Sequence, residues 1–212
     1  MTIKLFSSTT KTLVAAVALA AAGMASANTI VDGSYPGIQE SPGSFGIIFN
    51  SAAAMPATMN FDLLGFLSLD GAGNFYTDVF TLTVNGTSVF SGTFNMGGGG
   101  TNQIFSAPAG TTWSTIANPC VNPSLCSPGI NWNGGTTSVS ALPISLVKGS
   151  NTVIFSYDSL TTGGNHGPQT IADEGWGVGH YVISSVPEPE TYAMLLAGLG
   201  IIGAITRRRR KA

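Results

Sequence analysis

The chain has little charge and few reactive side chains. Only 8% of its 212 residues are charged, and it contains two cysteines and two histidines, with neither histidine near the cysteines in the sequence. Such a set does not favour a zinc site. The motifs G-x-S-x-G, H-E-x-x-H and C-x-x-C are all absent. We therefore predict no catalytic residue, no metal and no cofactor, and expect a protein that is not an enzyme.

Positive charge is nearly missing from the middle of the chain. Between residues 28 and 186, Lys148 is the only base, and eight acids give this part a net charge of −7, whereas the whole chain carries −2. The acids are Asp32, Glu40, Asp62, Asp70, Asp78, Asp158, Asp173 and Glu174. A surface of this sign repels polyanions, so we predict no nucleic-acid partner. It suits a secreted protein, or one that binds neutral sugar or calcium.

The N-terminal segment has the three parts of a secretory signal peptide. Lys4 and Lys11 precede an apolar run from Leu13 to Ala22, and Ala25-Ser26-Ala27 follows as an A-x-A cleavage site. We predict that residues 1–27 are a signal peptide and that the mature chain begins at Asn28. The alternative is an N-terminal anchor that is not cleaved.

The C-terminal segment, residues 187–212, combines a short motif, an apolar stretch and a cationic end. Pro187, Glu188 and Pro189 form the motif, and the uncharged stretch Tyr192–Thr206 favours helix. At about 22 Å this helix is shorter than a hydrocarbon core of roughly 30 Å, but the cations after it can reach the interface and should stay cytoplasmic. They are Arg207, Arg208, Arg209, Arg210 and Lys211. We predict a single transmembrane helix that holds the precursor in the inner membrane.

This tail resembles the PEP-CTERM sorting signal of Gram-negative bacteria. The resemblance lies in Val186–Gly200 together with the arginine run, and covers about an eighth of the chain. It implies recognition by an exosortase, a membrane-embedded cysteine peptidase, in a cell that makes exopolysaccharide. The processed protein is then expected at the cell surface or outside the cell.

Residues 28–186 show the pattern of an all-β domain. In Asp78–Phe94, apolar and polar residues alternate around Asn85-Gly86, which is typical of a two-residue hairpin turn. Pro143 indicates that its strand is at an edge or bulged. We predict a β-sandwich, and two segments, Leu146–Val153 and Gly177–Ile183, resemble the last strands of jelly-roll domains of the carbohydrate-binding type. Further strands are expected at Phe45–Asn50, Asn60–Leu69, Thr137–Leu146, Thr152–Tyr157 and Gly179–Ser185.

Two glycine- or proline-rich segments interrupt the strand pattern. Met96–Thr101 contains four consecutive glycines and is expected to be a mobile loop. Ala107–Gly135 is long and poor in strand signals, and it contains Cys120 and Cys126. In an exported chain with no other cysteine, we predict that these two form a disulfide.

Three groups of residues are candidates for a site. Asp70–Asn74 with Asp78 could ligate calcium, but the segment lacks the pattern of an EF-hand loop, and an Asp/Gly/Asn turn between strands is the favoured interpretation. His166 and His180 could join Asp173 and Glu174 in a metal or acid/base site, although solvated loop carboxylates are favoured. Aromatic side chains could stack on sugars or fill the core. The candidates for stacking are Trp113, Trp132 and Trp176.

These patterns leave three functions open. The favoured one is an exported, exosortase-processed protein of the cell surface or extracellular matrix that is not an enzyme. A carbohydrate-binding module in an exopolysaccharide or biofilm matrix is the alternative, and a secreted hydrolase is less favoured. A hydrolase would need two carboxylates in a concave pocket at the separation found in glycosidases.

Overall fold

In the computed structural model, residues 27–117, 134–161, 174–186, 196–203 and 206–207 are described. Residues Thr29–Ser185 form one compact unit, and residues 1–28 with 186–212 form a second. The segment predicted to be a signal peptide, residues 1–27, lies outside the described residues apart from Ala27.

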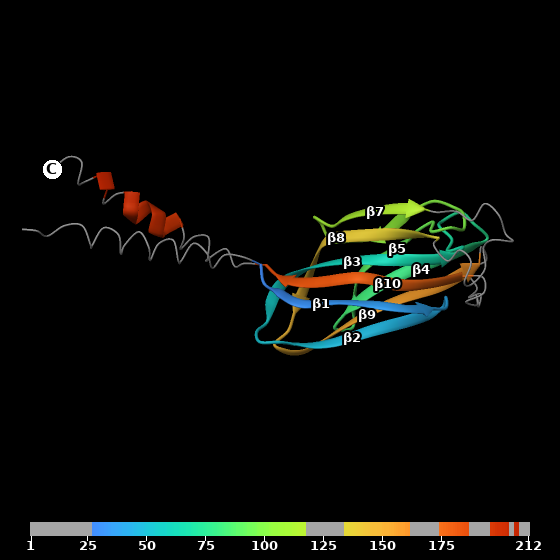
Figure 1. The fold of residues 1–212 in the computed structure, drawn as a ribbon, viewed down its shortest axis with the longest axis horizontal. Coiled ribbons are helices and arrows are strands. Elements are labelled where there is room, and N and C mark those ends of the chain that lie inside the picture. Colours follow the sequence, from blue (N-terminus) through green and yellow to red (C-terminus); the bar gives the residue numbers. More distant parts are fainter. Residues whose placement is uncertain (1–26, 118–133, 162–173, 187–195, 204–205, 208–212) are drawn as a thin grey trace, which may run out of the picture. The chain divides into compact units, whose positions relative to one another are not determined.

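The compact unit is a β-sandwich of two antiparallel five-stranded sheets, with strand orders β1-β10-β3-β8-β7 and β2-β9-β4-β5-β6 (Figure 1). The all-β sandwich predicted from the sequence is confirmed. The strands are β1 Thr29–Gln39, β2 Gly43–Ser51, β3 Met55–Leu67, β4 Tyr76–Val84, β5 Thr87–Thr93, β6 Gln103–Ser106, β7 Thr112–Ala117, β8 Gly135–Leu146, β9 Gly149–Thr161 and β10 Glu174–Ser185.

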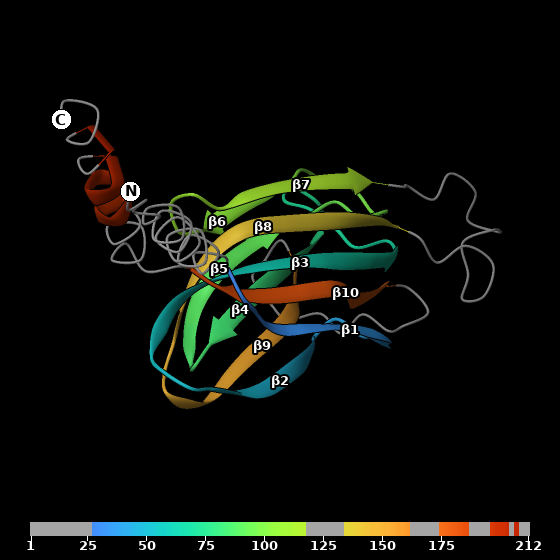
Figure 2. The ribbon, with the colours of Figure 1, turned by 60° about the vertical axis from the view of Figure 1, so that its left-hand side comes forward.

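The strands are nested as in a jelly roll. β1 to β4 alternate between the two sheets, and β8 to β10 alternate again on the way back. On this return β9 pairs with both β2 and β4, and β10 pairs with both β1 and β3. β6 and β7 extend the two sheets on the same side, as Figure 2 shows. This nesting places segments that are distant in sequence beside each other at both ends of the sandwich.

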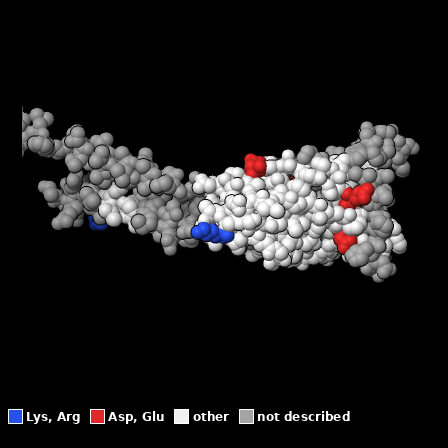
Figure 3. All heavy atoms as spheres, turned by 90° about the horizontal axis from the view of Figure 1, so that it is seen from below, with Lys and Arg blue, Asp and Glu red and all other residues white. Residues whose placement is uncertain are grey.

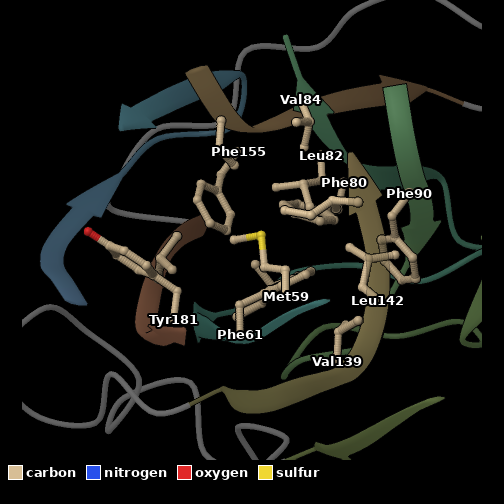
Figure 4. Close-up of a cluster of buried hydrophobic side chains, with 14 of the residues drawn as sticks. Met59, Phe61, Phe80, Leu82, Val84, Phe90, Val139, Leu142, Phe155 and Tyr181 are labelled. Carbon is tan, nitrogen blue, oxygen red and sulfur yellow. The ribbon is translucent and has the colours of Figure 1, made fainter. Parts of the chain in front are cut away.

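The core lies between the sheets and is rich in aromatic rings. Buried and partly buried side chains alternate along β3, β4 and β9, which is the pattern of strands with one face on a core. The rings of Phe61, Phe80 and Phe155 meet from both sheets, with centroids 5.6 to 6.4 Å apart (Figure 4). Each such pair adds packing energy beyond simple burial.

Two local predictions are confirmed. Asn85 and Gly86 have φ angles of 50° and 79°, as a type I′ turn requires, and join β4 to β5. Pro143 pairs with Thr58 of β3, whereas the pairing of β7 with β8 ends at Ser140. Pro143 is therefore locally at an edge, where its missing N–H leaves no partner unsatisfied.

Three further strands lie in segments that carry no strand signal in the sequence. β1 and β6 were not expected, and β7 lies within the segment predicted to be poor in strands. β7 is an edge strand whose side chains are mostly exposed, so it lacks the alternation by which a half-buried strand is recognised. β10 begins at Glu174, inside a region predicted as loop.

At one end of the sandwich, the buried side chain of Asn151 forms hydrogen bonds with two turns. Its Oδ1 accepts hydrogen bonds from Val147 N and Asn85 Nδ2, both 2.9 Å away. Its Nδ2 donates to Val147 O at 2.9 Å and to Gly149 O at 3.0 Å. This side chain thus joins the β8–β9 turn to the β4–β5 hairpin.

The second unit contains a short helix over residues 196–203, within the predicted helix Tyr192–Thr206. Residues 192–195 and 204–205 lie outside the described residues, as do Pro187 to Pro189 and Arg208 to Lys211. Among the residues that are described, no helix is both long enough and apolar enough to cross a membrane.

Candidate functional site

Three acidic side chains meet between the sheets at the end of the sandwich where β3 and β9 end and β4 and β10 begin (right in Figure 1). Asp70, Asp78 and Glu174 are 8%, 0% and 2% exposed, respectively. One carboxylate oxygen of each lies within 4.8 Å of the others. The sequence separates Glu174 widely from the two aspartates, and only the nesting of β10 against β3 brings it to them.

The strand pattern explains why these carboxylates point inward. Asp78 lies on the same face of β4 as the buried Phe80 and Leu82, because every second residue of a strand points to the same side. It therefore occupies a core position. Glu174 begins β10, opposite Leu67 of β3, two residues before the buried Trp176. The favoured interpretation of Glu174 as a solvated loop carboxylate is therefore wrong.

Asp70 is fixed by a network of short contacts. Its N–H donates to Asp78 Oδ2 at 2.7 Å, and Asp78 N donates to Asp70 O at 3.0 Å. Asn74 Nδ2 donates to Asp70 Oδ1 at 2.6 Å, so the predicted Asp/Gly/Asn turn is present. The turn and the acidic cluster are thus parts of one arrangement.

The glycine run, predicted to be a mobile loop, packs directly on this turn. Gly71 N donates to Gly99 O at 2.8 Å, and Ala72 and Thr101 exchange two backbone hydrogen bonds of 2.8 Å. A Cβ at Gly98 would stand 2.5 Å from the backbone oxygen of Ser68 and closer still to Asp70 Oδ1. Glycine is required here because the two backbones approach too closely for a side chain.

Burial raises the pKa of Asp78 above its ordinary value, and the hydrogen bonds that its carboxylate accepts, first from the Asp70 amide, lower it in part. Ser41 Oγ donates one of these bonds, to Asp78 Oδ1 at 3.0 Å. Charged carboxylates removed from water need neutralisation, by a proton or by a cation. The only lysine or arginine of the sandwich, Lys148, lies in the turn at its opposite end.

Two hydroxyl groups of β9 face the cluster. Ser159 lies opposite Asp78 in the β4–β9 register, and Tyr157 is two residues before it on the same face. Within the described part of the chain, the buried Tyr157 Oη has no hydrogen-bond partner. The pKa of Tyr157 is raised well above its ordinary value, mainly by burial and also by the charge of Asp78. Ser159 Oγ lowers the pKa of Asp78, although the two groups are not in good hydrogen-bond geometry.

The tryptophans predicted to stack on sugars do not form a common platform. Trp176 is completely buried, packs on Tyr157 and donates a hydrogen bond from Nε1 to Glu40 O at 2.9 Å. It is therefore part of the core and is not available to stack on a sugar. Trp113 on β7 is 40% exposed and packs against Phe94. Trp132 lies outside the described residues.

The remaining predicted residues lie apart from the acidic cluster or are not described. His180 Nε2 lies 2.8 Å from Asp32 Oδ1 on the surface, and both side chains are exposed. His166 and Asp173 lie outside the described residues, as do Cys120 and Cys126, so their disulfide stays a prediction. Sequence reasoning missed the link between Glu174 and the two aspartates, because no local pattern connects them.

Comparison with known proteins gives one match, at the C-terminal end. Residues 185–211 match the family model of the PEP-CTERM protein-sorting motif. No curated protein and no solved structure matches the chain. The chain therefore carries a PEP-CTERM protein-sorting motif, the mark of an exported protein that is targeted to an exosortase.

Proposed function

We propose that the β-sandwich acts, without catalysing a reaction, at the surface of a Gram-negative bacterium or in its extracellular matrix, after processing by an exosortase. The observation that carries the proposal is the position of the motif. β10, the last strand, ends at Ser185, and the Pro-Glu-Pro motif begins two residues later. Cleavage near the motif would thus remove the tail without removing any strand.

The acidic cluster supports a role other than hydrolysis. A retaining glycosidase places its two carboxyl groups about 5–5.5 Å apart, and an inverting enzyme places them further apart, in both cases on a cleft open to substrate. Here the three carboxylates lie closer together and are buried between the sheets. A sugar ring has no access to them in this arrangement.

The surface of the sandwich fits a protein that works in a hydrated matrix. The face shown in Figure 3 carries few charged groups, in agreement with the low content of charged residues in the sequence. Binding to exopolysaccharide is the second candidate function, because Trp113 and Phe105 expose 40% and 49% of their surface on the added strands β7 and β6. Exposed aromatic rings of this kind can stack on sugars.

Processing in the native host tests the proposal. Pro187→Ala and Glu188→Ala should leave uncleaved precursor in the membrane fraction, as measured by blotting and intact mass. Glu40→Ala removes an exposed acid within the sandwich and serves as the matched control, which should mature normally. Normal maturation of both tail variants would contradict the proposed processing.

A further inference from the structure

We propose that Asp70, Asp78 and Glu174 bind one calcium ion between the two sheets of the sandwich. This site is separate from the sorting motif and does not depend on the proposed function.

The spacing of the three carboxylates suits a calcium ion. Calcium–oxygen bonds are about 2.3–2.6 Å long, so two oxygens on opposite sides of the ion can be about 4.6–5.2 Å apart. The three ligand oxygens lie within 4.8 Å of one another, so one ion can contact all of them. Magnesium bonds of about 2.0–2.1 Å bring opposite oxygens to about 4.2 Å and demand a stricter octahedron. A limit of 4.8 Å accommodates the wider spacing of a calcium site, and calcium also accepts irregular geometry, so calcium is the ion that we propose.

The charge of the cluster also favours a divalent cation. Neutral donors contact the aspartates, namely the Asp70 amide, Ser41 Oγ and Asn74 Nδ2, and they stabilise the charges without cancelling them. The single lysine or arginine of the sandwich, Lys148, directly precedes β9, and Ser159, which lies opposite Asp78, is ten residues beyond the first residue of that strand, or about 33 Å. A divalent ion would offset the negative charge of the three carboxylates.

A separate observation indicates that a ligand is accommodated beside the carboxylates. Tyr157 is only 2% exposed, and its buried hydroxyl has no hydrogen-bond partner within the described part of the chain. Buried hydroxyl groups are rarely left unsatisfied, because this costs about 1–3 kcal/mol. The Tyr157 and Ser159 hydroxyls face Asp78 from β9 and offer neutral oxygen atoms to an ion or to its bound water.

The ion would connect parts of the fold that the sequence keeps apart. Asp78 belongs to β4 in one sheet, Glu174 to β10 in the other, and Asp70 to the turn on which the glycine run packs. A single ion bound to all three would cross-link both sheets and the turn. Calcium binding is thus expected to control stability.

The experiment uses the full chain, purified in detergent after removal of metal ions. Calcium at about 100 times its dissociation constant, which is about 10⁻⁴–10⁻³ M for extracellular modules, should raise Tm by about 5–10 °C. Terbium should bind in place of calcium and luminesce on excitation of the aromatic rings. Tyr157 adjoins the site, and the ring of Trp176 packs on the ring of Tyr157 with centroids 5.2 Å apart. Added calcium should quench this luminescence.

Three variants separate binding from folding. Asp78→Asn should abolish the response to calcium, but it also alters hydrogen bonds that hold the turn. Glu174→Gln keeps those bonds and should weaken calcium binding at least tenfold. Asp158→Asn removes a charge from the same strand as Ser159, one residue away on the partly exposed face, and should respond like the original protein.

Two results would overturn the proposal. The first is a folded full chain whose Tm and terbium signal do not respond to calcium. The second is a calcium response in Glu174→Gln that equals that of Asp158→Asn. A response to magnesium as large as that to calcium would contradict the assignment of the ion.

Discussion

Replacing Asn151 by alanine should destabilise the sandwich strongly, because this one side chain makes four hydrogen bonds at a closed end of the fold. Asn151 is fully buried, whereas Val147 is exposed and Gly149 is half-buried, so water can replace part of what is lost. At a net value of about 0.5–1.5 kcal/mol for each bond, less this replacement, the free energy of unfolding should fall by about 2–4 kcal/mol.

The assay is urea unfolding of the fragment Asn28–Val186, followed by far-UV circular dichroism. The fragment contains the whole compact unit and should be soluble and show a cooperative transition with a β-type spectrum. With a slope of about 2 kcal/mol/M, Asn151→Ala should move the midpoint down by about 1–2 M.

Two further variants test the reasoning. Asn50→Ala, on the exposed face of β2, should change stability by less than about 0.5 kcal/mol. Asn151→Asp keeps both acceptor contacts but points a carboxylate oxygen at Val147 O and Gly149 O, so it should be no more stable than Asn151→Ala. A stability loss below about 0.5 kcal/mol for Asn151→Ala would refute the role of this side chain as the link between the two turns.

Three other outcomes are expected. Gly98→Ala should lower the unfolding midpoint of the same fragment, because its Cβ would collide with Asp70 Oδ1 and stand 2.5 Å from Ser68 O. Gly46→Ala, whose Cβ would have contacts of 3.7 Å, is the control and should be tolerated. Equal stability of the two variants would show that the glycine run can move away from the turn. Trp113→Ala should weaken binding to isolated exopolysaccharide at a temperature where the variant is folded, if the exposed ring stacks on sugar, and the lost contact with Phe94 should lower Tm modestly. Unchanged binding in a pull-down with the polymer would remove this candidate surface. Periplasmic protein should contain no free thiol, because Cys120 and Cys126 pair after export; two thiols alkylated without reductant, seen by mass spectrometry, would contradict the pairing.

The sequence predicted those features that depend on residues close together in the chain. The sorting motif is a linear pattern, and its match at residues 185–211 needs no knowledge of the fold. The β4–β5 hairpin follows from Asn85-Gly86, because few residues other than these accept positive φ at both turn positions. Pro143 likewise predicts a local edge from its own missing N–H group.

The tertiary structure alone decided which of the candidate side chains are buried and which of them meet. Trp176 looked available for sugar stacking, but β10 turns it into the core, where hydrophobic burial outweighs exposure of a ring. Glu174 looked like a loop carboxylate, but the return of β10 against β3 carries it between the sheets to Asp70 and Asp78. Contacts of this kind depend on strand pairing over long sequence separations, and no local pattern of residues records them.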